Sequence, residues 1–404
     1  HRDEIRCYGF QRRTSLPETR FPSVIFRWKK LHRDCHVFHS GSGYPYAVSF
    51  SPTNDLKEIR NLVNQELLNF VAVENKYLNE IASELAPVAT AMERFLLDSG
   101  KRLRPLFAYI GFLGTGSKPS VEILRACAAL ELVHVCALMH DDVMDASDTR
   151  RGAPSIHKAF EALHDEEKLS GSSEQFGISA AILLGDLALV WSAKMLHQSG
   201  IDNESMIRSF PMYDEMRVEL MAGQFLDIYE QAFASESVER SLKVARYKSG
   251  KYTIERPLHF GAALGGANQK LFKTYSDYGL PLGEAFQLRD DVLGIFGNPD
   301  ETGKPAGDDL REGKRTVLLA KTMELADEKS KAVIKSALGN PRLTLEDVTP
   351  IREIIIGCGA LAEVEKLISS MTSSAQSALE HGEIDPVGKV ALTQLLTIVT
   401  QRTL

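Results

Sequence analysis

The stretch SVEILRACAALELVHVCALMHDDVMD, residues 120–145, predicts a long helix that is apolar for most of its length and acidic at its end. Its apolar side chains recur at the three- and four-residue spacing of a helix. Asp141 and Asp145 are four residues apart and share one helical face, whereas Asp142 is rotated from Asp141 by about 100°. Two like charges on one face repel each other unless a cation lies between them. Magnesium prefers such oxygen ligands and is typically bound by one or two carboxylates together with substrate phosphates. Taken alone, the pattern fits a solvated acidic helix end equally well.

Basic residues follow these carboxylates closely. Arg150 and Arg151 lie in the string DTRRG, residues 148–152. A guanidinium group offers a planar fork of donors that suits phosphate oxygens. Carboxylates, a metal ion and two arginines so close in sequence favour a diphosphate site over a random run of charge.

A second acidic pair, Asp290 and Asp291, ends the string FQLRDD on another predicted helix. Lys304 and Lys314 follow in a stretch with several glycines, which is typical of a flexible loop that closes over a polyanion. Two other basic strings are YKSGK at 247–251 and GKRLRP at 100–105. Each string alone is more typical of surface charge or of a basic turn, so the prediction depends on the whole set.

Helical periodicity dominates the chain from about residue 56 onward. The expected helices are 56–98, 120–145, 175–199, 203–233, 236–265, 270–296, 313–327, 330–338, 345–357, 359–380 and 386–401. Alternating β-branched runs are scarce, and no fixed repeat indicates a solenoid. We therefore predict an all-α fold, a single-domain bundle of long helices around a central active-site cavity, spanning residues 56–404.

Composition changes before that domain. Residues 1–40 carry a net charge of +5, against −7 for the whole chain, and residues 40–56 are rich in Gly, Pro, Ser and Asn. We interpret residues 1–55 as a basic extension that is disordered or not native. An Arg-rich targeting peptide is the alternative, which the acidic residues of the stretch disfavour.

The bulk composition excludes several classes of protein. The acidic net charge argues against a nucleic-acid partner, and no apolar run reaches the length of about 18 residues that predicts a transmembrane segment. The five cysteines form no CxxC pair, so neither a disulfide framework nor a cysteine metal site is expected.

Taken together, these residues resemble the trans-isoprenyl diphosphate synthase family over about residues 60–400. The matching positions are Gly100, Lys101, Arg104, His134, Asp141, Asp142, Asp145, Arg150, Arg151, Lys248, Ser249, Gln287, Asp290, Asp291, Lys304 and 309–314. The strings MHDDVMDASDTRRG and FQLRDDVLGIFG look most like bacterial geranylgeranyl diphosphate synthases. The resemblance implies a magnesium-dependent prenyltransferase that condenses isopentenyl diphosphate with allylic diphosphates (dimethylallyl, geranyl or farnesyl), as a cytoplasmic homodimer.

The resemblance also implies a role for each residue. Three Mg2+ ions are expected, two on Asp141 and Asp145 and one on Asp290, with Asp142 and Asp291 in support. The expected allylic diphosphate ligands are Arg150, Lys248 and Lys304, and those of isopentenyl diphosphate are Lys101, Arg104, His134 and Arg151. Ser249, Gln287 and Lys314 are expected to contact substrate. Catalysis is expected to depend on Asp141, Asp145, Arg150, Lys248, Asp290 and Lys304.

One position departs from the family pattern. The second acidic motif usually reads DDxxD, but here Gly294 stands in place of its last Asp. We expect catalysis to survive with a more open outer part of that metal site. Ser249 replaces the usual threonine and keeps its hydroxyl.

Product length is expected to depend on the residues before Asp141. Within the family, aromatic side chains four and five positions earlier stop the chain at fifteen carbons. Here these positions are Ala137 and Cys136, with Val133 one turn deeper, so we expect twenty carbons. A longer polyprenyl product and a farnesyl product remain alternatives.

Two other readings of the motifs are less favoured. Class I terpene cyclases share the first acidic motif but usually carry an Asn/Ser/Glu-type second motif and lack the basic residues at Lys101 and Arg104. Non-catalytic partner subunits tend to lose the aspartates that this chain keeps.

Overall fold

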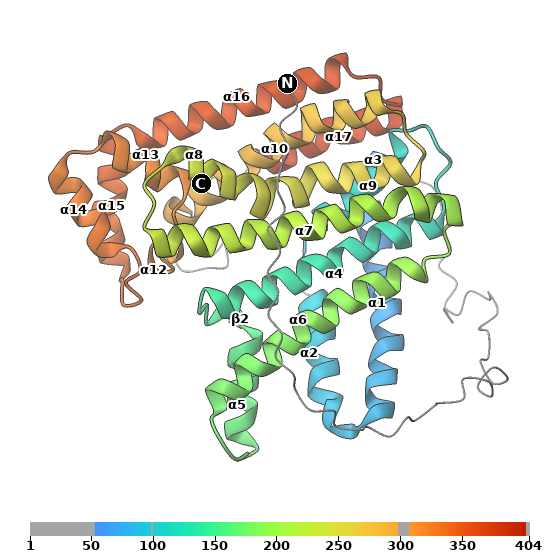
Figure 1. Cartoon of the computed structure of the whole chain (residues 1–404), viewed down its shortest axis with the longest axis horizontal. Helices are drawn as coiled ribbons and strands as arrows, with labels where there is room; N and C mark the ends of the chain where they lie inside the picture. The colour runs from blue at the N-terminus through green and yellow to red at the C-terminus, as the bar shows by residue number, and fades with distance from the viewer. Residues whose placement is uncertain (1–52, 98–99, 298–306, 401–404) are drawn as a thin grey trace, which may run out of the picture. The chain divides into compact units, whose positions relative to one another are not determined.

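The computed structural model describes residues 53–97, 100–297 and 307–400. Most of the predicted extension 1–55, and Lys304, therefore lie outside the described residues. Within the described part the chain is almost wholly helical, with a single two-stranded sheet (Figure 1). This confirms the all-α prediction.

The first half of the described chain contains the helix that ends in the first acidic residues. Its elements are α1 (Leu56–Ile81), the 3-10 helix η1 (Ser83–Leu85), α2 (Ala86–Leu97), α3 (Leu103–Leu113), α4 (Val121–Met144), β1 (Thr149–Arg150), β2 (Ala153–Pro154), α5 (Ile156–Glu166), α6 (Ser173–His197) and α7 (Asn203–Phe233). The predicted helix 56–98 is interrupted, because Ala82 adopts an extended backbone. Helices α3 and α5 are additional to the prediction.

The second half carries the basic string 247–251 and the second acidic pair. Its elements are α8 (Val238–Val244), the π-helix η2 (Ala245–Glu255), α9 (Arg256–Leu264), α10 (Gln269–Phe296), α12 (Asp308–Arg311), α13 (Val317–Leu325), α14 (Glu328–Ala337), α15 (Leu345–Gly357), α16 (Ala360–His381) and α17 (Pro386–Thr400). The single helix expected at 236–265 is thus α8, η2 and α9 in sequence.

The core consists of two clusters of buried apolar side chains. The larger one joins α1, α3, α4, α6, α7 and α9 with the first part of α10, and the smaller one joins the end of α10 to α13–α16. Helix α4 packs against α3 and α6 and is buried on nearly all sides from Ile123 to Cys136. A helix that is apolar all round needs such a central position.

Helix α6 bears on the prediction of no transmembrane segment. By length and composition alone it could cross a membrane, and 39% of its apolar window is buried. A single helix of this kind is weak evidence, because core helices of soluble proteins pass the same test. Its exposed apolar side chains include Ile182, Leu183 and Val190.

Candidate active site

Asp141 lies in the last turn of α4 and contacts groups from two other helices. Its Oδ1 accepts hydrogen bonds from Lys248 Nζ on η2, at 2.9 Å, and from Gln224 Nε2 on α7, at 2.8 Å. Burial raises the pKa of this carboxyl, but Lys248, Lys314 and Arg150 outweigh it and hold the pKa well below its usual range. Asp141 is therefore ionised and surrounded by cations.

Asp145 caps the same helix one turn later, as the four-residue spacing predicts. Lys314 Nζ lies 3.0 Å from Asp145 Oδ2 and also pairs with Glu312. Burial, reinforced by Asp141 and opposed by Lys314, raises the pKa of Asp145 to about 6. The segment after α12 thus reaches back to the end of α4, and the Ser147 hydroxyl donates to Glu312 Oε1 at 2.6 Å.

Asp142 is rotated away from its neighbours and is fully buried. It accepts hydrogen bonds from the guanidinium of Arg150, with the Nε contact at 2.8 Å. The same guanidinium lies 3.6 Å from Asp141 Oδ2. Asp142 therefore positions Arg150 beside the outward-facing carboxylates, and its predicted metal contact stays a prediction.

A tight hairpin positions the two arginines. Strand β1 pairs antiparallel with β2, and Arg151 and Gly152 form the turn with φ of 53° and 75°. Two-residue hairpins favour positive φ at both turn positions, which glycine adopts without strain. Arg151 contacts Phe95 on α2, with its Nη1 3.4 Å from the Phe95 carbonyl oxygen. The two arginines therefore point to different surroundings.

The π-helix η2 carries Lys248 and is fixed by close backbone contacts. A side chain on Gly223 of α7 would overlap the backbone of Lys248, 2.3 Å from its nitrogen. A Cβ on Gly283 of α10 would likewise lie 2.6 Å from the backbone of Gly250. π-Helical turns are rare and frequently occur at functional sites. Lys248 Nζ also contacts Asp227 Oδ2 at 2.6 Å, so it bridges α4 and α7.

The second acidic pair lies in the last turns of α10. Asp291 is buried and accepts from Gln287 Nε2 at 2.7 Å, whereas Asp290 is half-buried. Burial, with the charges of Asp309 and Asp290, raises the pKa of Asp291 to about 8. Asp291 therefore lies among other carboxylates, in a setting where a bound cation would be stabilised.

A basic cluster, Arg104, His134, Tyr252 and Thr253, lies where α3, α4 and η2 meet. Arg104 donates to the Tyr252 hydroxyl at 2.6 Å and to Thr253 Oγ1 at 2.8 Å. His134 Nδ1 lies 3.1 Å from the same Tyr252 hydroxyl. Burial and the charges of Arg104, Arg151 and Arg150 lower the pKa of His134 well below its usual value, so the imidazole is neutral. The cluster joins Arg104 and His134 as predicted, while Lys101 is exposed just before α3.

The oxygen donors fit magnesium in kind. Within residues 53–97, 100–297 and 307–400, no three Asp, Glu, His or Cys side chains converge as an ion site. Instead, ammonium groups of Lys248 and Lys314 lie against Asp141 and Asp145. These carboxylates already bind cations on the face where a hard divalent ion would be held.

A polyprenyl synthetase family model matches residues 86–355 of this chain. The chain belongs to the polyprenyl synthetase family. It is accordingly a trans-prenyltransferase. The geranylgeranyl diphosphate synthase of Sulfolobus acidocaldarius is 31% identical over 305 residues, 75% of this chain and 84% of that protein. The geranylfarnesyl diphosphate synthase of Aeropyrum pernix is 31% identical over 309 residues, 75% of this chain and 90% of that protein.

A solved structure of the family is similar throughout the catalytic region. The geranylgeranyl pyrophosphate synthase of Corynebacterium glutamicum, complexed with isoprenyl diphosphate and magnesium, is 41% identical and has a TM-score of 0.84. The match covers 86% of this chain and 100% of that chain. The resemblance inferred from the motifs is thereby confirmed.

Four polar residues of the site were missed in the sequence: Gln224, Asp227, Tyr252 and Thr253. Gln224 and Asp227 follow Gly223, which lies inside the long helix α7. A mid-helix glycine costs about 1 kcal/mol relative to alanine, so it indicates a close backbone approach. Gly223 could therefore have pointed to Gln224 and Asp227 in the sequence of this polyprenyl synthetase. Tyr252 and Thr253 could not be placed at the site without knowing that residues 245–255 form a π-helix.

The predicted chain-length residues lie on the buried part of α4. Val133 and Cys136 are fully buried and Ala137 is half-buried. Next to them, His140 Nε2 lies 3.0 Å from the carbonyl oxygen of Ile182 on α6. Gly185 permits this packing, because a Cβ there would lie 2.1 Å from the imidazole.

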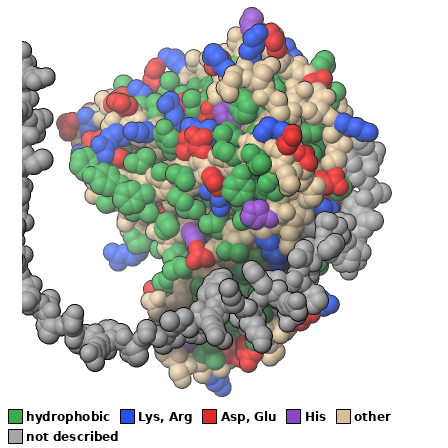
Figure 2. Space-filling model, turned by 45° about the vertical axis from the view of Figure 1, so that its right-hand side comes forward, with side chains coloured by type: hydrophobic (Ala, Val, Ile, Leu, Met, Phe, Trp, Pro, Cys, Tyr) green, Lys and Arg blue, Asp and Glu red, His purple; other side chains and the backbone are tan. Residues whose placement is uncertain are grey.

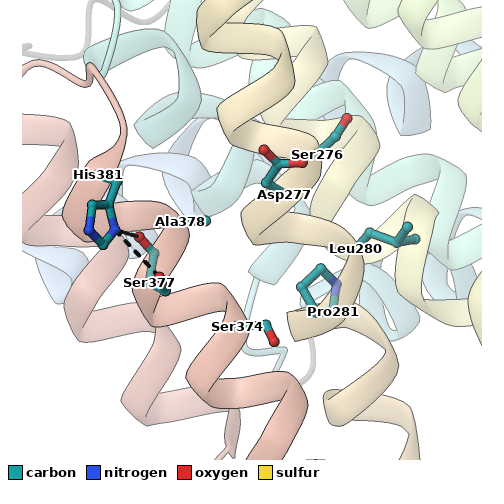
Figure 3. Close-up of a pocket in the computed structure, with 8 residues that line it drawn as sticks. All are labelled: Ser276, Asp277, Leu280, Pro281, Ser374, Ser377, Ala378 and His381. Carbon is teal, nitrogen blue, oxygen red and sulfur yellow. Dashed lines mark hydrogen bonds between the residues drawn. The ribbon is translucent and has the colours of Figure 1, made fainter.

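An open pocket of about 550 Å³ lies elsewhere in this polyprenyl synthetase, between α10 and α16. Its lining residues are Ser276, Asp277, Leu280, Pro281, Ser374, Ser377, Ala378 and His381 (Figure 3). His381 turns to Ser377 on its own helix, and Asp277 is paired with Lys273. With no Lys or Arg in this lining, the pocket does not suit a diphosphate.

Proposed function

We propose that this polyprenyl synthetase makes geranylgeranyl diphosphate from isopentenyl diphosphate and shorter allylic diphosphates. The observation that supports it most is the pairing of two distinct polar regions across α4. Asp141, Asp145, Arg150 and Lys248 lie at its end, and the basic cluster with Arg104 and His134 lies about two turns earlier. Two such regions fit two anionic substrates, an allylic diphosphate that is bound with magnesium and isopentenyl diphosphate that is bound without it.

Magnesium, three ions in number, would neutralise the departing diphosphate and hold its oxygens against Asp141, Asp145 and Asp290. Lys248 and Arg150 donate hydrogen bonds to the same leaving group, which stabilises its charge as the allylic C–O bond breaks. Lys304, outside the described residues, is proposed for the same role. Gln287 positions Asp291 through its hydrogen bond.

The basic cluster holds isopentenyl diphosphate with its double bond near the allylic cation. Arg104 supplies the charge of this cluster, and neutral His134 supplies a hydrogen bond. Arg151 and Lys101, outside the cluster, are proposed as further cations for the same substrate. The double bond attacks the cation, and the proton then leaves to the released pyrophosphate. The buried apolar length of α4 excludes water, which would otherwise quench the cation.

Product length is proposed to follow from α4. Small side chains at Cys136 and Ala137 leave room for a chain longer than fifteen carbons. The relative from Aeropyrum pernix is a geranylfarnesyl diphosphate synthase, so a product longer than twenty carbons is the second candidate.

The test is incubation of the purified protein with isopentenyl diphosphate, Mg2+ and each allylic starter, followed by measurement of product length. We expect a twenty-carbon end product from every accepted starter and no turnover after chelation of the metal. Absence of product with all starters would contradict the proposal, and a fifteen-carbon end product would contradict the argument from Ala137.

We also propose that the enzyme is a homodimer through α6 and α7. Both helices expose apolar side chains: Ile182, Leu183 and Val190 on α6, and Val218, Met221, Phe225, Tyr229 and Phe233 on α7. The latter recur every three or four residues, so they form one stripe. Figure 2 shows one face of the molecule on which hydrophobic side chains meet in contiguous groups. Exposed apolar surface of this extent indicates an interface.

A further inference from the structure

Gly294 leaves the second acidic motif without its last carboxylate. Positions 290 and 294 are four residues apart on α10, so a side chain at 294 would share the face of Asp290. Because Gly294 has no side chain, the space beside Asp290 on this face of α10 would be empty unless another residue filled it.

Asp309 occupies that space. A Cβ built on Gly294 would lie 2.2 Å from Asp309 Oδ2 and 2.9 Å from its Cγ. The backbone N–H of Gly307, in a left-handed conformation with φ of 78°, donates to the Gly294 carbonyl at 3.1 Å. This bond satisfies a carbonyl in the last turn of α10 and holds the start of α12 against it.

The carboxylate of Asp309 also faces the first acidic residues. Lys314 Nζ lies 3.9 Å from Asp309 Oδ1 and 3.0 Å from Asp145 Oδ2. A single ammonium group therefore lies between the carboxylate of Asp309 on α12 and that of Asp145 at the end of α4. Asp309 therefore borders the position that the Lys314 ammonium group takes beside Asp145.

We propose that Asp309 supplies, from α12, the carboxylate that α10 lacks at position 294, and that it serves the metal ions bound with the diphosphate. This inference rests on the proposed function. Gly294 and Asp309 then form one unit, because a side chain at position 294 would have to displace the Asp309 carboxylate. The missing side chain of Gly294 leaves room for Asp309. The third carboxylate of the acidic motif is then supplied by Asp309, although the motif in the sequence of α10 lacks it.

The experiment measures Mg2+ binding in the presence of inorganic pyrophosphate by titration calorimetry, on the full chain and on four variants. Asp309→Asn keeps the shape of the side chain and removes its charge. Gly294→Asp restores the usual motif but collides with Asp309, and the double variant Gly294→Asp with Asp309→Gly moves the carboxylate onto α10. Asp308→Asn is the matched control, because Asp308 is the adjacent acid and pairs with Arg311.

We expect Asp309→Asn and Gly294→Asp each to weaken Mg2+ affinity roughly 10- to 100-fold, the range typical of groups that support metal ligands. The double variant should recover to within about threefold of the wild type, and Asp308→Asn should match the wild type, on the same scale. Thermal unfolding without metal separates misfolding from loss of binding, and Asp309→Asn carries the test if Gly294→Asp does not fold.

Unchanged Mg2+ affinity in Asp309→Asn overturns the inference while the proposed function stands. A double variant that is worse than both single variants overturns it as well. If the wild type shows no Mg2+-dependent binding of pyrophosphate, the proposed function itself fails, and this inference falls with it.

Discussion

Arg102 and Arg104 are two residues apart, yet their guanidinium groups have different surroundings. Arg102 is buried against Glu131, Asn64 and the Leu96 carbonyl, with N–O distances of 2.9, 2.7 and 2.6 Å. It therefore ties the start of α3 to α1, α2 and α4. Arg104, one residue inside α3, turns to Tyr252 and Thr253 on η2. Of these two arginines, Arg104 is the one that we propose as a substrate ligand.

Replacing Arg104 with Gln should raise the KM for isopentenyl diphosphate about 10- to 100-fold, because charged hydrogen bonds contribute about 1.5–3 kcal/mol. The KM for the allylic diphosphate should stay near the wild-type value. Arg342→Gln, a change of the same kind at an exposed site, is the control. Steady-state kinetics with each substrate varied in turn checks this, and equal effects on both KM values would count against a separate basic site.

Asp291 is expected to make the stability of the metal-free protein depend on pH. Its pKa is raised from 3.8 to about 8, so the folded state keeps a proton that the unfolded state loses. Such a group stabilises the fold at low pH, and this contribution is lost as the pH rises toward about 8. Asp291→Asn keeps the Oδ1 acceptor of Gln287 and cannot ionise.

The free energy of unfolding of the chelated wild type should therefore fall more steeply between about pH 5 and about pH 8 than that of Asp291→Asn. Urea unfolding at several pH values measures both slopes. Parallel slopes would show that Asp291 is ionised throughout.

At the scale of single elements, Gly223 tests how η2 is positioned. Alanine favours a helix by about 1 kcal/mol over glycine, yet here its Cβ would overlap the backbone of Lys248. We expect Gly223→Ala to lower kcat/KM at least about tenfold, because Lys248 and its contact with Asp141 move. Gly357→Ala at the end of α15 meets nothing within 4 Å and is the control. Equal activity of the two variants would contradict the role of Gly223 in positioning η2 and Lys248.

Helix α4 carries the prediction on product length. Ala137→Phe adds an aromatic ring about one turn before Asp141, so the product should shorten from twenty to fifteen carbons. Product analysis by chromatography measures this, with thermal unfolding to confirm that the half-buried site accepts the ring. A twenty-carbon product from a folded variant would place the stop on another helix.

Sequence periodicity located α4, α6, α7, α10 and α16 because each repeats its apolar side chains over several turns. It missed α3, which has Arg104 and Pro105 in its first turn, and α5, for which no helix was expected. The i, i+4 rule placed Asp141 and Asp145 together without a structure. No such rule could find Asp309 opposite Gly294, since that contact joins α10 to α12 and depends on tertiary packing alone.

At the scale of the whole molecule, α6 has a face of apolar side chains that is exposed to solvent in the single chain. Leu183 and Val190 are 66% and 62% exposed and lie two helical turns apart on one face of α6. A membrane would cover that face, and so would a second copy of the chain. Charged residues, among them Asp186 and Lys194, lie on the same face. Asp186 is exposed and lies near His140, and Lys194 pairs with Glu74. Charged groups of this kind favour a second copy of the chain over a membrane.

The double variant Leu183→Glu with Val190→Glu should therefore convert a dimer into a monomer, since a twofold interface repeats each change in both subunits and would bury four carboxylates that lack partners. Sedimentation velocity measures the mass, and Val390→Glu on α17, equally apolar and exposed, should leave it unchanged. Activity should fall together with dimerisation if α6 and α7 hold Gln224 and Asp227 in place through the interface. A wild type that sediments as a monomer would contradict the interface, and binding of the wild type to lipid vesicles would assign the apolar face of α6 to a membrane.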